Sequence, residues 1–265
     1  MNTDAFEKEL RKENYAENTI IAYTYAVRVY FSQYETIEKE NLLQFRTRLI
    51  ESRMPKTVNV RIRGINKYLE YIGRPDMKIK MVKTPKSSFL DHVISNEDYL
   101  FFKNKLQGEE DRRWYFIVWT LAATGARIGE LVRIRREHVR TGYYDIYSKG
   151  GKIRRIHLPK RLREELLAWI GQESGYLFVN QYGAQITPRG VADRLKKLAL
   201  KYGIEAKVVH PHSFRHLFSL NFLAKSNDLA LLADLLGHDS MDTTRIYLQR
   251  SSREQKKLVD SFVDW

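Results

Sequence analysis

Four short segments in the C-terminal half of the sequence carry cationic, imidazole and phenolic side chains in an order that could act on a phosphate. In the first, residues 123–131, Arg127 follows Gly125 at the expected start of a helix, and the rigid fork of a guanidinium suits phosphate. Glu130, about one helical turn further on, could orient that arginine. In the second, Lys149 lies in a Gly-Gly turn, where a flexible ammonium could donate a proton. Alone, the first segment is only suggestive, because a surface Arg-Glu pair gives the same pattern, and an isolated lysine in such a turn is more often solvated.

The third and fourth segments add two histidines, a second arginine and a tyrosine. His212 and Arg215 are three residues apart, so on a helix they share a face. Gly237 is predicted to end a helix, which puts His238 at an exposed turn. Tyr247 follows in the next predicted helix. It is one of 16 tyrosines in the chain, and a tyrosine between two aliphatic residues usually packs in a core.

Together these groups match the needs of phosphodiester cleavage. That reaction takes a nucleophile, cations that hold the charge on the non-bridging oxygens, and a general acid for the leaving oxygen. A metal site is the weaker interpretation, because His212 and His216 lack a third good ligand nearby and Pro211 makes a joint site with His210 awkward. We therefore expect no metal and no other cofactor.

The combined set closely resembles the signature of the tyrosine recombinase family, which includes phage integrases and Xer-like recombinases. That signature runs Arg, a hairpin Lys, His-x-x-Arg, Leu-Gly-His and Tyr. The resemblance covers about residues 96–248 and extends more weakly to the N-terminal part, where Asn18, Thr19 and Tyr23 look like the start of the family's core-binding domain. The matching residues of this chain are, in order, Arg127, Lys149, His212, Arg215, His238 and Tyr247.

For the phosphate, the resemblance implies that Arg127 and Arg215 clamp the scissile group and that His238 hydrogen-bonds a non-bridging oxygen. Phe214 stands where the family usually has leucine, a change of volume that a core tolerates.

For the protons, the resemblance implies that Lys149 is the general acid for the 5′-hydroxyl and that His212 assists proton transfer with the tyrosine. Lys152 is a rival to Lys149, although the Lys-Gly-x-Lys pattern favours Lys149. Tyr247 would attack and leave a 3′-phosphotyrosine and a free 5′-hydroxyl. Neither ATP nor metal is implied, because the ester keeps the bond energy and arginines take the place of a metal ion.

The elements that must position these residues read as mainly α with a small β-hairpin, an α+β class. Residues 114–124 are strongly apolar and predict the core helix of a second domain, for which the resemblance implies a catalytic domain over 95–250. Ser95 and Thr187 are expected to cap helices. Alternation over 143–158 predicts two strands joined by the Gly-Gly turn. Further helices are predicted near 191–202, 212–225, 229–236 and 241–248.

The N-terminal part reads as a small helical module. Three apolar stripes have helical spacing, the first after a cap at Asn18 or Thr19 and the third from Pro55 to Gly73. The resemblance implies a core-binding, SAM-like DNA-binding domain over 1–80, and a basic linker is predicted over 81–94. Basic side chains lie between the stripes and in the linker. We expect phosphate contacts from Lys56, Arg61, Arg63, Lys67 and Lys83.

Composition agrees with a nucleic-acid partner. The net charge is +14 and the pI about 9.7, which favours a polyanion over a protein that is merely basic and soluble. The absence of cysteine excludes disulfides, thiolate catalysis and cysteine-ligated zinc. The polar N-terminus is no signal peptide, and the longest apolar run is too short for a bilayer. A cytoplasmic protein without membrane contact is the simplest account.

Other properties follow from the resemblance or stay open. Double-stranded DNA is the implied substrate, and four protomers would act together on two sites. The tail, 251–265, could pack on a neighbouring protomer or on its own domain. A catalytically silent DNA-binding protein and a type IB topoisomerase-like enzyme are the alternatives. The target site, the biological role, and any second recombinase or accessory factor cannot be predicted from the sequence.

Overall fold

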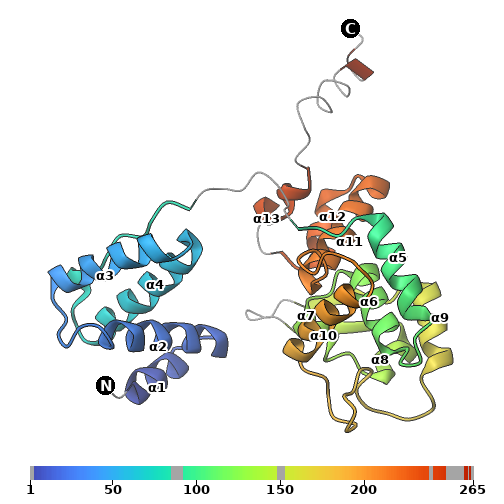
Figure 1. The fold of residues 1–265 in the computed structure, drawn as a ribbon, viewed down its shortest axis with the longest axis horizontal. Helices are drawn as coiled ribbons and strands as arrows, with labels where there is room; N and C mark the ends of the chain where they lie inside the picture. Colours follow the sequence, from blue (N-terminus) through green and yellow to red (C-terminus); the bar gives the residue numbers. More distant parts are fainter. Residues whose placement is uncertain are drawn as a thin grey trace. The chain divides into compact units, whose positions relative to one another are not determined.

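The chain divides into two compact units, unit 1 (residues 1–87) and unit 2 (residues 88–265). The division lies inside the range that was predicted as a linker. Apart from loops, the described residues are helical except for one two-stranded sheet (Figure 1), which confirms the predicted mainly α class with a small β-hairpin. The computed structural model describes residues 3–84, 92–147, 153–238, 241–248, 260–261 and 263.

The described residues of unit 1 form four helices and one 3-10 turn. Its core includes Tyr30, Phe45 and Ile62, which are at most 1% exposed. The second helix begins at Glu17 and its N-cap is Ala16, so the predicted cap at Asn18 or Thr19 was two to three residues late. The elements of this unit are α1 (Asp4–Lys12), α2 (Glu17–Phe31), α3 (Lys39–Ser52), α4 (Pro55–Tyr71) and η1 (Pro75–Met77).

The chain leaving unit 1 is held against α4 by two asparagines of that helix. Asn59 donates to the carbonyl oxygen of Val82 and accepts from its N–H, both at 2.9 Å. Asn66 makes the same pair of bonds with Ile79, also at 2.9 Å. These bonds replace the pairing that an extended segment would find in a sheet. Residues 81–84, predicted as linker, therefore lie on the surface of α4.

Unit 2 is organised around α6 (Arg113–Thr124). Trp114 through Leu121 are all buried, so the helix is apolar on every side. It packs against α5, α9 and α11, as predicted for the core helix. The other elements are α5 (Asn96–Gln107), α7 (Ile128–Leu131), α8 (Arg136–Thr141), β1 (Tyr143–Tyr147), β2 (Ile153–His157), α9 (Lys160–Trp169), α10 (Pro188–Lys201), α11 (Pro211–Ser226), α12 (Leu229–Leu236), α13 (Met241–Arg245) and η2 (Ile246–Leu248).

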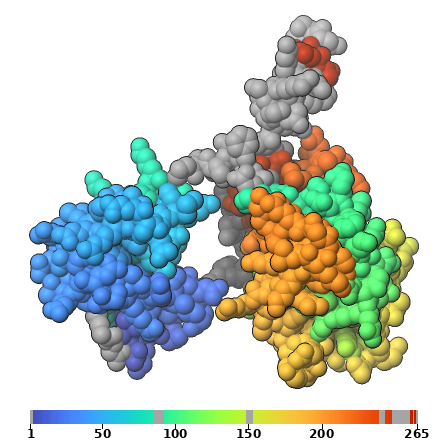
Figure 2. Space-filling view, viewed as in Figure 1, coloured from blue at the N-terminus to red at the C-terminus, as the bar shows by residue number. Residues whose placement is uncertain are grey.

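Local signals set the ends of several of these helices. Ser95 accepts a hydrogen bond from the N–H of Asp98 at the start of α5, and Thr187 accepts one from Gly190 at the start of α10. Both predicted caps are therefore confirmed. Asn96 of α5 and Asn221 of α11 exchange hydrogen bonds of 3.1 and 2.8 Å, and the green α5 lies beside the orange α11 in Figure 2.

The sheet consists of β1 and β2, paired antiparallel with Tyr143 opposite His157 and Tyr147 opposite Ile153. The predicted Gly-Gly turn, including Lys149, lies outside the described residues. Ile153 is 61% exposed, whereas Arg154 is 7% exposed. The strand thus turns Arg154 inward on the same face as buried Ile156, and it turns Ile153 outward.

In the part of the chain that the structure describes, no helix combines the length and apolar character needed to cross a bilayer.

Candidate active site

The site begins where α6 stops. Gly125 caps that helix in the left-handed region, with φ of 63°, where a residue with a side chain is strained. A Cβ atom there would lie 2.6 Å from Cδ1 of Phe218. Both facts call for glycine. The turn delivers Arg127 as the N-cap of α7, as predicted for an arginine at the start of a helix.

Arg127 belongs to a network around Glu130. Its Nη1 donates to Oε1 of Glu130 at 3.0 Å, and its Nη2 donates to the carbonyl oxygen of Gly237 at 3.2 Å. From the other side, Nη1 of Arg154 donates to both carboxylate oxygens of Glu130, at 2.7 and 2.9 Å. The Arg127 side chain is 42% exposed, whereas that of Arg154 is 6% exposed. Arg127 is therefore the member of the pair that can meet a ligand.

Arg154 also ties this network to the end of α12. Its Nε donates to the carbonyl oxygen of Leu235 at 2.7 Å. Gly237 then caps α12 with φ of 60°, and a Cβ atom there would lie 2.4 Å from Cδ of Arg154. The glycine of the Leu-Gly-His motif is thus required by the close passage of Arg154, and the residue that follows it is His238.

Arg215, from the first turns of α11, is buried, with 4% of its surface exposed. Its Nη1 donates to the carbonyl oxygen of Gly125 at 2.7 Å and its Nη2 to that of Leu236 at 2.6 Å. These two carbonyl oxygens belong to the ends of α6 and α12, where the helix dipole favours a cation. Arg215 therefore joins both helix ends.

His238 meets Arg215 and Thr244. Its Nε2 lies 3.1 Å from Nη2 of Arg215, and its Nδ1 lies 2.7 Å from Oγ1 of Thr244. A guanidinium has only donors, so Nε2 accepts in the neutral imidazole and Nδ1 carries the hydrogen that is donated to the threonine. Thr244 is fully buried. The ring is thus oriented from both sides.

Tyr247 lies in the 3-10 turn after α13, and 8% of its surface is exposed. Its ring packs in a small cluster with Leu223, Leu232 and Leu236. Its hydroxyl lies 2.8 Å from Nδ1 of His216 on α11. The candidate nucleophile is therefore seated on the helix that carries Arg215.

The site concentrates positive charge. Burial, then the neighbouring Arg127 and Arg154, lower the pKa of Arg215 to about 10, although Glu130 opposes them. His212 is exposed on α11, and partial desolvation followed by Arg215 and Arg127 lowers its pKa. Cations that destabilise one another in this way are stabilised when an anion binds between them.

The pKa of Tyr247 is raised by burial, against opposing effects of a hydrogen bond with Ser219 and of the charge on Arg215. A phenol in this environment holds its proton at neutral pH and needs a partner to release it.

The structure brings together Arg127, Arg215, His238 and Tyr247, with His212 beside the two arginines. Lys149, the predicted general acid, lies outside the described residues.

Three residues around the site were missed in the sequence. Arg154 could have been found from strand alternation, which places it on the face of buried Ile156. Thr244 and His216 gave no local signal, because their roles come from contacts with His238 and Tyr247. Among the residues that the structure describes, no cluster of three or more His, Asp or Glu side chains could hold a metal ion.

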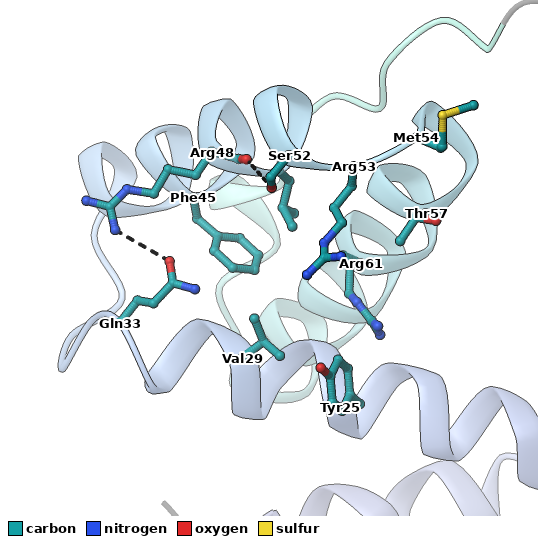
Figure 3. Close-up of a pocket in the computed structure, with 11 residues that line it drawn as sticks. Tyr25, Val29, Gln33, Phe45, Arg48, Ser52, Arg53, Met54, Thr57 and Arg61 are labelled. Carbon is teal, nitrogen blue, oxygen red and sulfur yellow. Dashed lines mark hydrogen bonds between the residues drawn. The ribbon is translucent and has the colours of Figure 1, made fainter.

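Unit 1 carries a separate basic hollow of about 440 Å³ between α2, α3 and α4, shown in Figure 3. Arg53 and Arg61 extend into it. Nη1 of Arg48 lies 3.5 Å from Oε1 of Gln33. The Arg61 guanidinium also stacks 4.1 Å above the ring of Tyr25. Among the described residues that line the hollow none is acidic, so an anion would meet arginines without a competing carboxylate.

The predicted DNA-contact residues of unit 1 differ in their availability. Lys56, Arg63 and Lys83 are exposed, and Arg61 lines the hollow. The ammonium of Lys67 instead lies 2.6 Å from Glu13 and 3.2 Å from Glu70, and its side chain is 17% exposed. Its charge is therefore used within unit 1.

Known proteins share both the sequence pattern and the fold. The model of the phage integrase family matches residues 97–254, more than half of the chain. The chain belongs to the phage integrase family. It is a tyrosine recombinase, an enzyme that cleaves and rejoins DNA, as the resemblance in the sequence predicted.

Relatives of this family match over nearly the whole chain. The tyrosine recombinase XerA of Thermococcus kodakarensis is 27% identical, over 98% of this chain and 96% of its own. The TnP I resolvase of Bacillus thuringiensis is 26% identical, over 96% and 97%.

Two solved structures support the fold. One is the Tn1549 transposon integrase in complex with transposon right end DNA, with a TM-score of 0.74, 15% identity and 99% of both chains covered. The other is the XerH recombinase bound to its difH substrate, with a TM-score of 0.71, 20% identity, and 98% of this chain and 85% of that one covered.

Proposed function

We propose that this tyrosine recombinase cuts DNA by attack of the Tyr247 hydroxyl oxygen on a scissile phosphate held by Arg127 and Arg215. The observation that carries the proposal is the position of Arg215, which contacts both helix ends and His238, while the Tyr247 hydroxyl contacts the next residue of α11, His216. Guanidinium groups held in this way lower the cost of the negative charge that develops on the non-bridging oxygens.

In this reaction one ester replaces another. A bond forms between phosphorus and the Tyr247 oxygen, and the bond to the 5′-oxygen breaks. The phenolic proton leaves with help from His212, and Lys149 supplies a proton to the departing 5′-oxygen. The product is a 3′-phosphotyrosine with a free 5′-hydroxyl. Attack of a 5′-hydroxyl from a second strand reverses these steps and rejoins the DNA without ATP.

We assign double-stranded DNA as the substrate of both units, with unit 1 as the core-binding domain and unit 2, through about residue 250, as the catalytic domain. In unit 1 the basic hollow adds Arg48 and Arg53 to the predicted phosphate contacts, while the ion pairs of Lys67 favour a structural role for it. Guanidinium groups can bind phosphate with two donors. The Tn1549 integrase is in complex with transposon right end DNA and XerH is bound to its difH substrate, which supports this assignment.

Recombination joins two DNA sites, and by resemblance to the family we propose that four copies of the chain assemble on them. We also propose that the protein acts in the cytoplasm. The tail, residues 251–265, which could pack on a neighbouring protomer or on its own domain, lies almost wholly outside the described residues. Packing on a neighbouring protomer is the alternative that we propose. It is tested by removing the residues after Ser251. Loss of tetramers on DNA supports contact between protomers, whereas unchanged tetramer formation excludes it.

The proposed chemistry is tested by covalent capture. The full chain is incubated in EDTA with a library of nicked duplexes that carry a randomised central segment, so that strand loss at the nick prevents rejoining. Complexes that survive detergent are recovered and their DNA is sequenced. We expect an enriched duplex with the wild-type protein and none with Tyr247→Phe. Capture that is equal with the two proteins, or absent with both, would overturn the proposal.

A further inference from the structure

The contact between Tyr247 and α11 has a partner that the recombinase signature does not include. His216 directly follows Arg215, and its Nδ1 lies 2.8 Å from the hydroxyl of Tyr247. The two rings are 5.6 Å apart between centroids and tilted by 53°. Ser219, one helical turn further along α11, also interacts with that hydroxyl. The oxygen that would attack phosphorus is thus held by side chains of one helix face.

We propose that His216 is a positioning residue for the nucleophile, which seats the Tyr247 hydroxyl on α11 beside Arg215 in the same chain. The inference rests on the proposed function of Tyr247. It deepens that function by naming the group that fixes where the attacking oxygen lies before and during attack. His216 contacts neither of the two phosphate-binding arginines in the described hydrogen bonds, so it acts through the tyrosine.

The surroundings of His216 favour positioning over proton storage. Burial, then the neighbouring His212, His210 and Arg215, lower the pKa of His216 to about 4. The ring is therefore neutral at pH 7 and adds no further positive charge to the site. A base works best when its pKa is close to the working pH. An imidazole with so low a pKa is too weak a base to keep the proton of the Tyr247 hydroxyl. Another group must therefore deprotonate the tyrosine.

Other contacts hold the two partners in register. The Tyr247 ring packs with Leu223, Leu232 and Leu236 from α11 and α12, so the backbone of η2 is held close to α11. Ser219 donates a hydrogen bond of 2.8 Å to the carbonyl oxygen of Arg215, which keeps its side chain oriented along the helix. The apolar cluster fixes the ring, and His216 fixes the oxygen. Loss of His216 would leave the ring in place and its hydroxyl without its nitrogen partner.

The contact is made through Nδ1 of His216. Two substitutions that introduce an amide can therefore distinguish loss of this contact from loss of the imidazole ring in general. In His216→Asn the amide lies near the position of Nδ1, whereas in His216→Gln it lies near that of Nε2. Each variant is incubated with the duplex from the covalent selection, and the rate of phosphotyrosine formation is measured beside DNA binding. We expect rates about tenfold lower for His216→Gln and His216→Leu, the factor that loss of one hydrogen bond corresponds to. His216→Asn should stay close to the wild-type rate.

A second measurement separates positioning from damage to the site. In a Tyr247→Phe background, hydroperoxide serves as an external nucleophile that attacks the same phosphorus and releases the same 5′-hydroxyl. Addition of His216→Leu should leave peroxide cleavage unchanged, whereas addition of Arg215→Ala should abolish it. Equal loss of tyrosine-driven and peroxide-driven cleavage in His216→Leu would overturn the inference, as would wild-type or faster rates for that variant. Failure of the wild-type protein to form a covalent complex would instead refute the proposed function.

Discussion

Replacing Arg154 by methionine should destabilise unit 2 far more than the same change at its neighbour Arg155. Arg154 is buried and holds both oxygens of Glu130 and the carbonyl oxygen of Leu235. Breaking a buried ion pair costs about 3–5 kcal/mol. The lower end applies here because Glu130 keeps its contact with the half-exposed Arg127. We therefore expect a loss of about 3 kcal/mol, or about 6–12 °C in melting temperature for a unit of this size.

Arg155 is the matched control because it lies on the same strand and also forms a bidentate pair, with Asp145 at 2.7 Å. Its side chain is 47% exposed, and exposed pairs contribute about 0.2–1 kcal/mol. Thermal melting of the full chain, followed by circular dichroism, compares Arg154→Met and Arg155→Met directly. Equal shifts for the two variants would refute the view that the Glu130 network holds the site together.

The same substitution tests the link from stability to chemistry. Without Arg154, Glu130 would bind Arg127 alone and neutralise the cation that is proposed to meet the phosphate. Well below the melting temperature of the variant, DNA binding should be retained while the covalent complex decreases by at least about tenfold, the factor for one weakened charged hydrogen bond. Retained cleavage in a destabilised protein would show that Arg127 does not depend on this network.

Three further predictions follow from the described contacts. Gly125→Ala should lower the melting temperature much more than Gly73→Ala. Both glycines have positive φ, but only at Gly125 would a Cβ atom press against a neighbouring side chain, the ring of Phe218. Equal shifts for the two variants would contradict this. The pKa of His216 is about 4 in the folded chain against 6.5 in the unfolded one, so the unfolded chain takes up the proton first and stability is lost as the pH falls from about 6.5 toward 4. Between pH 7 and 4.5, urea titrations should show a loss about 2–3 kcal/mol larger for the wild type than for His216→Asn, and parallel losses would exclude a buried neutral imidazole. In gel-shift assays at several salt concentrations, Arg53→Ala should weaken DNA binding and reduce the salt slope by about one, whereas Lys67→Ala should change neither; the reverse order would place the DNA on another face of unit 1.

Features with local causes could be predicted from the sequence. The apolar run of α6 has too many buried-type residues for a surface helix, and Ser95 and Thr187 precede their helices with the side chain that a cap needs. The candidate site could be predicted because its motifs keep their order and spacing, even though Tyr247 alone resembles a packing residue.

Features that depend on distant partners could not be predicted in this way. Arg154 lies inward on β2 because Glu130 of α7 and the end of α12 meet there. Lys67 belongs to a basic cluster in sequence, yet Glu13 at the end of α1 forms an ion pair with it. In both cases the partners are set by tertiary contacts: strand alternation indicates that Arg154 faces inward, but no local pattern identifies the groups that it or Lys67 pairs with.

The central claim is that Tyr247 carries the DNA, and peptide mapping of the trapped complex tests it most directly. Trypsin cleaves after Arg245 and Arg250, so the nucleophile would lie in the five-residue peptide 246–250, which contains one tyrosine. After nuclease digestion, mass spectrometry should find the remaining nucleotide attached to that peptide. Attachment to a peptide that carries any other tyrosine, or recovery of 246–250 only in its unmodified form from trapped protein, would contradict the account.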